Sequence, residues 1–350
     1  MPTWTVEHAD CLDFLRSLPA DSVDLVLGSP PYEQARLYLE GGVNLGVARK
    51  TEAWVSWMVD VFQAAQQACR GLVAFVVAGQ TKNYRWSAGP ALLAADLHRA
   101  GFNLRNPPIF SRVGIPGSGG PDWLRGDYEW IICTSRPGKL PWSDNTAAGH
   151  PPKWTLGGEM SNRSVDGSRK NAHGVDTSRP IGTRPGGDKG KKGQSEKETY
   201  RAKLRTKGGS PKDGLCEKGQ ERFGKGRRIT SGHVNGDTPN DDTYDPPVLA
   251  NPGNIIHLNV GGGVMGSKLC HENEAPFPEK LAEFFVRSFC PPGGLVVDPY
   301  SGSGTTGAVS VRNGRRFAGC DLRQSQVDLS RRRISGETPD LFESAAAALL

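Results

Sequence analysis

The chain has 350 residues, a formal net charge of +6 and a hydrophobic fraction of 36%, which is enough to build the core of one large or two modest domains. No apolar run approaches the roughly 20 residues that span a bilayer, and the opening MPTWTVEHAD lacks a basic segment followed by an apolar one. We therefore expect no membrane association and a cytoplasmic location. Seven scattered cysteines without a CxxC pair predict reduced thiols and no metal site.

Strand-like and helical patterns alternate in the first part of the chain, residues 1–137. Apolar runs predict strands, and amphipathic stretches predict helices. In chain order these are a strand at 23–27, a helix at 52–69, a strand at 72–78, a helix at 90–100, a Gly- and Pro-rich loop at 111–123 and a strand at 130–134. The alternation predicts an α/β fold in which helices flank a mostly parallel sheet.

Residues 138–252 differ in composition, because polar and basic residues and glycine replace most of the apolar ones. From Lys153 to Arg228 there are 20 Lys and Arg against 9 Asp and Glu, a surplus of +11, whereas the rest of the chain has 23 against 28. We predict a basic, loop-rich insertion that is either a solvated linker or a DNA recognition region, and its internal position favours DNA. The residues expected to contact DNA phosphates are Lys191, Lys192, Arg201, Lys203, Arg205, Lys207, Arg227 and Arg228.

The α/β pattern returns in residues 253–335, before a tail at 336–350. The predicted elements are a strand at 255–258, a helix at 278–289, a strand at 294–299, a helix at 305–313, a strand at 317–322 and a helix that ends near residue 334. We expect this part and residues 1–137 to be two halves of one domain, with their strands in one sheet.

The stretch SPPY, residues 29–32, directly follows the strand predicted at 23–27. Two prolines can simply end a strand. Because proline fixes φ, they can also hold Ser29 and Tyr32 rigidly at the carboxyl edge of a sheet, where ligands bind in open α/β folds. The stretch alone does not decide between these two interpretations.

A second candidate site follows the strand at 294–299. Gly302, Gly304 and Gly307 form a GxGxxG pattern between that strand and a helix, where glycines let a nucleotide approach the helix N-terminus. Asp321, about twenty positions later, suits the ribose of NAD and of S-adenosylmethionine alike. The acidic Asp298 at the end of the strand favours a cationic cofactor, because it would attract an ammonium group and not a pyrophosphate.

These residues resemble the motifs of DNA amino-methyltransferases. DPYSGSGTTG, residues 298–307, resembles their cofactor motif D-P-F-x-G-S-G-T-T, with tyrosine in place of phenylalanine, and SPPY resembles their catalytic motif [DNS]-P-P-[YFW]. HADCLDFL at 8–15 and HENEAPFPEK at 271–280 resemble the stretches near the adenine and the methionine end of the cofactor. The order, catalytic motif first and cofactor motif last, is similar to that of the β class.

The resemblance implies a Rossmann-like enzyme that binds S-adenosyl-L-methionine and methylates a base flipped out of double-stranded DNA. It implies catalytic roles for Ser29, Pro30, Pro31 and Tyr32: the Ser29 hydroxyl and the Pro30 carbonyl would accept the two amine hydrogens, and Tyr32 would stack on the base. It implies cofactor contacts for Asp10, Cys11, Phe277, Asp298, Tyr300, Ser301, Gly302, Ser303, Gly304, Thr305, Thr306 and Asp321.

The target base and the partners are less strongly indicated. Serine in the first motif position is more typical of cytosine-N4 enzymes and aspartate of adenine-N6 enzymes, so the motif favours N4-methylcytosine, with N6-adenine as the alternative. A cognate restriction endonuclease, as in a restriction-modification pair, is a candidate partner, and monomer and homodimer both stay open. Alternatives from other classes are a non-catalytic nucleic-acid-binding protein and an NAD-dependent dehydrogenase, although the latter leaves residues 29–32 unexplained.

Overall fold

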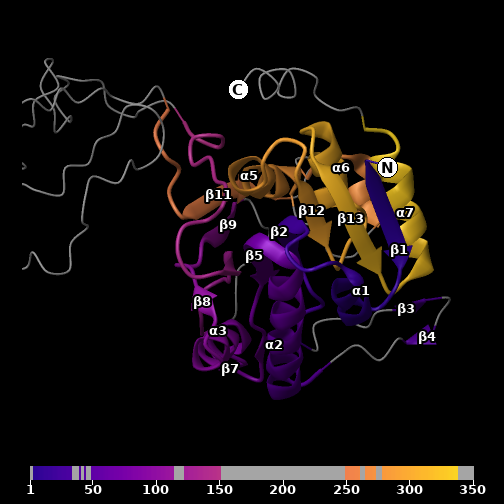
Figure 1. The fold of residues 1–350 in the computed structure, drawn as a ribbon. Helices are drawn as coiled ribbons and strands as arrows, with labels where there is room; N and C mark the ends of the chain where they lie inside the picture. Colours follow the sequence, from indigo (N-terminus) through magenta and orange to yellow (C-terminus); the bar gives the residue numbers. More distant parts are fainter. Residues whose placement is uncertain are drawn as a thin grey trace, which may run out of the picture. The chain divides into compact units, whose positions relative to one another are not determined.

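The computed structural model describes residues 3–33, 39–40, 43–44, 49–113, 122–150, 249–260, 265–272 and 278–337 (Figure 1). Its internal contacts divide the chain into one unit of Met1–Ala148 with Pro252–Leu350 and a second unit of Gly149–Asn251. In the second unit, the described backbone forms an antiparallel bridge between His150 and Ala250. The domain boundaries predicted at residues 137, 252 and 335 stay predictions.

A mixed sheet forms the centre of the first unit, with strand order β1-β13-β12-β2-β5-β10-β9-β11 and β8 paired to β10 (Figure 1). The first five strands run parallel, β10 is antiparallel to both β5 and β9, and β11 is parallel to β9. The bounds are β1 Trp4–His8, β2 Val23–Gly28, β5 Cys69–Val77, β8 Asn103–Leu104, β9 Ile109–Val113, β10 Tyr128–Ser135, β11 Ile255–Asn259, β12 Leu295–Asp298 and β13 Arg316–Asp321. Two short ladders pair β3 Leu39–Glu40 with β4 Val43–Asn44 and β6 Thr81–Lys82 with β7 Arg85–Trp86.

Strands from the two ends of the sequence lie side by side in this sheet. Trp4 of β1 lies opposite Phe317 of β13, and Val26 of β2 lies opposite Val297 of β12. The predicted α/β fold with a mostly parallel sheet is therefore confirmed, and so is the expectation that both halves contribute to it. The loop predicted at 111–123 is wrong at its start, because β9 continues to Val113 by pairing with β11.

Helices cover both faces of the sheet (Figure 1). On one face lie α1 Cys11–Ser17, α2 Thr51–Ala68 and α3 Gly89–Arg99, and on the other lie α5 Glu279–Phe289, α6 Thr305–Arg312 and α7 Gln324–Ile334, with a short 3₁₀ helix at Lys268–Glu272. Alternation along β2 explains both cores, because Leu25 and Leu27 pack with α5 and α6 while Val26 packs with α2. No helix in the described part of the chain has the length and apolarity needed to cross a membrane.

A buried carboxylate ties the two halves together at the amino end of β2. Asp24 is 6% exposed and lies where the register between β2 and β5 shifts. Its Oδ2 accepts a hydrogen bond from the Leu295 backbone N–H at 2.9 Å, and its Oδ1 accepts one from Arg70 Nε at 2.8 Å. The first residue of β12 is thus fixed against β2, which sets the pairing of the two strands that lead into the site.

The connections change direction between β2 and β12. The chain leaves β2 and returns through α2 to β5 on one side, whereas it leaves β12 and returns through α6 to β13 on the other side. In open α/β sheets, ligands bind in the crevice at the carboxyl ends of two such strands. The topology therefore points to the carboxyl ends of β2 and β12, which lead into Ser29 and Asp298.

Candidate functional site

The loop of residues 29–32 leaves the carboxyl end of β2 and is fixed to the core behind it. Pro30 is buried, and the Pro31 carbonyl accepts a hydrogen bond of 2.8 Å from Nε1 of Trp54. Trp54 lies in α2 and is only 1% exposed, so packing in the core fixes the position of its indole. The loop is therefore held by a long-range hydrogen bond in addition to the two fixed proline φ angles.

A chain of polar groups extends from Ser29 across two further strands. Ser29 Oγ lies 3.4 Å from both the Tyr32 hydroxyl and the Val76 carbonyl oxygen, which is the long end of hydrogen-bond range. The Tyr32 hydroxyl donates to Oε2 of Glu129 at 2.9 Å, and Oε1 of Glu129 lies 3.1 Å from Nη1 of Arg112. Glu129 and Arg112 thus fix the tip of the Tyr32 side chain.

Burial shifts the pKa values of Tyr32 and Glu129. It raises the pKa of Tyr32 well above its ordinary value, and the negative charge of Glu129 acts in the same direction. Burial also raises the pKa of Glu129, against the opposing effect of the Arg112 cation. Tyr32 is therefore a neutral hydrogen-bond donor at physiological pH, with its ring held in one place.

Sequence reasoning did not identify Glu129 or Arg112. Neither residue belongs to a motif, and Glu129 is 97 positions away from Tyr32. They meet because β9 and β10 pair with Glu129 opposite Phe110, which brings the carboxyl end of β9 and the amino end of β10 to the edge that holds Ser29. Only the pairing of these strands could have revealed them.

The second part of the site is Asp298 at the end of β12. Its side chain is 2% exposed; Oδ1 accepts from the Tyr300 N–H at 2.9 Å and Oδ2 accepts from Thr306 Oγ1 at 2.7 Å. Burial raises the pKa of Asp298 to about 7, and the neighbouring charge of Asp321 adds to this against the two hydrogen bonds. With this pKa, the Asp298 carboxyl group changes between its neutral and its charged form near neutral pH.

The loop and the cofactor-motif turn touch at Gly28. A Cβ atom on Gly28 would lie 2.5 Å from Oδ1 of Asp298 and 3.4 Å from Cδ2 of Tyr300. Any other residue at the last position of β2 would therefore push against the carboxylate. The absence of a side chain here lets the end of β2, which leads into Ser29, lie against Asp298, 270 residues away in sequence.

The turn after Asp298 is supported by α7 and β13. Ser301 Oγ lies 2.8 Å from Ser330 Oγ, and Arg333 of α7 donates to Ser303 Oγ at 3.2 Å and to Thr305 Oγ1 at 3.0 Å. Gly304, directly before the first residue of α6, has a φ of +77°, a conformation that favours glycine. The side chains of Ser301, Ser303 and Thr305 thus hold the turn in shape.

Two further acidic residues lie at the neighbouring strand ends. Asp321 ends β13, where its Oδ2 accepts from the Gly302 N–H at 3.0 Å and its Oδ1 from the Arg323 N–H at 2.9 Å. Asp10 follows β1 and caps α1, with its Oδ1 accepting from the Leu12 N–H at 2.8 Å. Because β1, β13 and β12 are parallel neighbours, Asp10, Asp321 and Asp298 lie along one edge of the sheet.

The other predicted cofactor residues lie near this edge or outside the described residues. Cys11 is the first residue of α1 and is buried, which raises the pKa of its thiol to about 11. The Tyr300 ring packs edge-on against Trp57 and Phe75, with centroid distances of 6.0 and 5.8 Å. Phe277 and all eight of the basic residues expected to contact DNA lie outside the described part of the chain.

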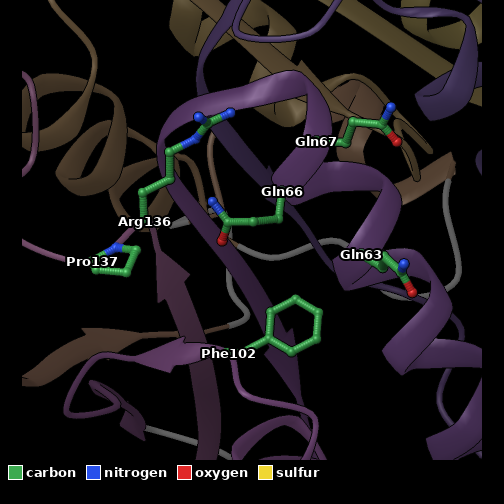
Figure 2. Close-up of a pocket in the computed structure, with 6 residues that line it drawn as sticks. All are labelled: Gln63, Gln66, Gln67, Phe102, Arg136 and Pro137. Carbon is green, nitrogen blue, oxygen red and sulfur yellow. The ribbon is translucent and has the colours of Figure 1, made fainter.

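An open depression of about 470 Å³ lies elsewhere, between α2 and the end of β10 (Figure 2). Figure 2 shows Gln63, Gln66 and Gln67 on α2, with Phe102, Arg136 and Pro137 completing the lining. Residues 136 and 137 follow the carboxyl end of β10, which is antiparallel to β5, so the depression lies at the sheet edge opposite to Ser29 and Asp298. It is not part of the site at the carboxyl edge.

Comparison with known proteins identifies the family. A family model described as DNA methylase, of the N6 and N4 type, matches residues 23–332. Among solved structures, PvuII DNA methyltransferase (cytosine-N4-specific) aligns with a TM-score of 0.54 and 17% identity and covers 97% of each chain. This likeness shows the fold, a Rossmann-like methyltransferase fold.

Curated relatives match over a shorter stretch. The orphan methyltransferase M.BamHII of Bacillus amyloliquefaciens is 36% identical over 67 residues, which cover 19% of this chain and 25% of that protein. The type II methyltransferase M.Cfr9I of Citrobacter freundii is 36% identical over 73 residues, which cover 21% and 24%. The chain thus matches about a quarter of the length of these relatives.

Proposed function

The chain belongs to the N6- and N4-type DNA methylase family, whose members depend on S-adenosylmethionine, and from this premise we propose that it methylates the exocyclic amine of a base in double-stranded DNA. The observation that carries the proposal is the close approach of Gly28, the residue directly before Ser29, to Asp298. A group that donates a methyl and a group that accepts it must lie within a few ångströms of each other. The switch point between β2 and β12 offers that proximity.

The acidic residues at three adjacent strand ends suit the chemistry of S-adenosylmethionine, which is cationic and carries ribose hydroxyls. Asp298 would hold the ammonium group of its methionine part, Asp321 the ribose hydroxyls and Asp10 the adenine side. NAD, with its pyrophosphate, would meet repulsion at Asp298. When bound, the cofactor supplies an activated methyl group, so the chain needs to position the base and exclude water without forming a covalent intermediate.

Ser29 and Pro30 would prepare the target amine. The lone pair of an exocyclic amine is delocalised into the base ring, so the amine is a poor nucleophile until its hydrogens are held out of the ring plane. The Ser29 hydroxyl proton is directed to the Val76 carbonyl or the Tyr32 oxygen, which leaves oxygen lone pairs to accept an amine hydrogen. The Pro30 carbonyl, its direction fixed by the following proline, would accept the other.

Tyr32 would stack on the flipped base. Its hydroxyl is already bonded to Glu129, so the ring does not need to be ordered when the base arrives. Flipping costs a few kcal/mol, and aromatic stacking at about 1–3 kcal/mol per base offsets much of this. Glu129 and Arg112 act as positioning residues in this account.

Cytosine N4 is the preferred target, and adenine N6 is the alternative. Serine at the first position of the SPPY motif supports cytosine, and the structurally similar PvuII enzyme is described as cytosine-N4-specific. The curated relatives include both an orphan and a type II methyltransferase, so a cognate endonuclease and a solitary enzyme are both compatible with the family. The basic insertion would supply the contacts to DNA phosphates.

Incubation of the purified chain with mixed-sequence duplex DNA and isotopically labelled S-adenosylmethionine, followed by nucleoside mass spectrometry, tests the proposal. We expect labelled N4-methylcytosine in the wild-type reaction and none with Ser29→Ala. Labelled N6-methyladenine would keep the mechanism and change the base. Absence of any methylated nucleoside, with cofactor binding demonstrated by calorimetry, would overturn the proposed function.

A further inference from the structure

The hairpin of β6 and β7, Thr81–Trp86, projects from the carboxyl edge of the sheet a few residues after β5. Thr81 pairs with Trp86, and Lys82 pairs with Arg85, so Asn83 and Tyr84 form a two-residue turn. Their φ angles are +50° and +59°, as in the type I′ turns that suit strand twist. Asn tolerates this conformation, but a bulky aromatic residue rarely adopts it. A Tyr at this turn is not explained by backbone geometry, and strain of this kind directs attention to a function.

The exposed side chains of the hairpin are aromatic and basic. Tyr84 is 83% exposed, Trp86 is 45% exposed, and Lys82 and Arg85 are also exposed. The segment 81–86 contains no acidic residue. Neither Lys82 nor Arg85 forms an ion pair with any residue in the ranges that the structure describes. An exposed aromatic ring between two exposed cations suits a nucleic acid, whose bases stack and whose phosphates attract the cations.

The base of the hairpin is attached to the catalytic loop. The Ser87 N–H donates to the Gln80 carbonyl at 2.8 Å and closes the hairpin, and the Gln80 N–H donates to Ser87 Oγ at 3.0 Å. Ser87 Oγ in turn donates to Oε1 of Glu33, which is 3% exposed and directly follows Tyr32. Glu33 thus connects the hairpin to the loop that would hold the flipped base.

The Trp86 side chain packs against the stem of the hairpin. A Cβ atom added to Gly79 would lie 2.3 Å from Nε1 of Trp86. The hairpin is therefore anchored at its base by Ser87 and Trp86, while its tip bears an exposed ring. A rigid element of this shape can enter a base stack without being ordered first.

We propose that this hairpin is a DNA-contacting element that promotes base flipping: Tyr84 inserts beside the target base and stacks in the duplex, while Lys82 and Arg85 contact the flanking phosphates. The inference rests on the proposed function and extends it to a second recognition element besides the basic insertion. Proteins that insert a side chain between base steps use the same principle, since the inserted group compensates for lost stacking.

Tyr84→Gly in the full chain gives the most direct test, because glycine suits the positive φ and the variant should fold at least as well as the wild type. On an unmodified, fully base-paired duplex that contains the sequence methylated by the wild type, we expect methyl transfer to slow by about tenfold. This is the size of one lost stacking contact. On a duplex with a mismatch opposite the target base, the defect should shrink to less than about threefold, because the base is already unpaired. Tyr84→Phe should behave as the wild type, because it keeps the ring.

Fluorescence of 2-aminopurine placed next to the target base reports flipping without methyl transfer. We expect Tyr84→Gly to lower the signal while calorimetry shows unchanged cofactor affinity. Equal rates of Tyr84→Gly and wild type on the matched duplex, or an equal defect on matched and mismatched duplexes, would overturn the inference. Failure of the proposed function is distinct, because the wild type would then methylate no DNA at all.

The basic residues have a separate test. Replacing both Lys82 and Arg85 by Ala should reduce the slope of log K against log salt for duplex binding by about 2, one for each phosphate contact. Arg16 and Lys139 offer a matched double control, because both are exposed and lie away from the carboxyl edge, in the last turn of α1 and just after the end of β10. An unchanged slope in the double variant, Lys82→Ala with Arg85→Ala, would contradict the proposed contacts of these two residues to DNA phosphates.

Discussion

The turn that contains Asp298 and the loop that contains Ser29 are held by different kinds of contact. The turn is held from nearby, by residues of α6, β13 and α7 that all lie between residues 306 and 333. The loop is held from a distance, by Trp54 of α2, the Val76 carbonyl of β5 and Glu129 of β10. The turn proposed to bind the cofactor is thus a local motif, whereas the loop proposed to carry the catalytic residues depends on correct pairing of the sheet.

This difference predicts which variants separate binding from chemistry. Changes in the turn should weaken cofactor binding, and changes in the distant supports of the loop should slow methyl transfer with cofactor affinity intact. A substitution at Gly28, where the two regions touch, should affect both cofactor binding and methyl transfer.

Asp298→Asn should have the largest effect on binding. The amide oxygen can still accept from the Tyr300 N–H, and the amide NH2 can donate to Thr306 Oγ1, which reverses the direction of that bond. The negative charge is lost, so we expect cofactor affinity to fall by about 100-fold, in line with the loss of a charged hydrogen bond. Isothermal titration with S-adenosylmethionine measures this. Asp13→Asn, an exposed acidic residue in the first turn of α1, is the control. Wild-type affinity in Asp298→Asn would remove the assigned ammonium contact.

Gly28→Ala should damage both regions at once. Its Cβ would overlap Asp298 Oδ1, so we expect the free energy of unfolding to fall by about 1–3 kcal/mol, together with weaker cofactor binding and slower methyl transfer. Chemical denaturation gives the stability. Gly126→Ala, where a Cβ meets nothing within 4 Å, should be neutral. Full stability and activity in Gly28→Ala would show that the two regions do not depend on this contact.

Glu129→Gln and Tyr32→Phe test the distant support of the loop. Each removes or weakens the hydrogen bond that fixes the Tyr32 ring, and we expect kcat to fall by about tenfold with unchanged cofactor affinity, the value of one buried hydrogen bond to a charged group. The double variant should be no slower than the single variants, because both act through one bond. Additive effects, or a change in cofactor affinity alone, would contradict the role of Glu129.

The pH dependence of cofactor binding tests the buried carboxylate. The pKa of Asp298 is raised to about 7, so the group is protonated and neutral below that pH and attracts an ammonium group only above it. Affinity should therefore rise as pH increases from 5.5 to 7, by roughly tenfold per unit well below the pKa. The same shift makes the free energy of unfolding fall as pH rises from about 4 to 7, because the folded state holds the proton more tightly. Asp298→Asn should show neither trend.

The two regions also differ in how far the sequence predicted them. The strand, turn and helix of residues 295–312 follow from the apolar run, the glycines and the start of α6, all within one short window. The SPPY loop was predicted as a motif, but Glu129 and Arg112 depend on the register of β9 and β10, which no local pattern encodes. The hairpin at 81–86 was missed because its strands have two residues each, and its turn carries Tyr where a glycine would have indicated a turn.

The measurement that tests the account most directly is the single-turnover rate of methyl transfer by Ser29→Ala at saturating cofactor and DNA. Saturation removes binding effects, so the rate reports the role of the loop alone. We predict a loss of at least about 100-fold with cofactor affinity equal to that of the wild type, within the range for general acid–base and positioning groups. A rate equal to that of the wild type would contradict the claim that the loop at the carboxyl end of β2 carries out the chemistry.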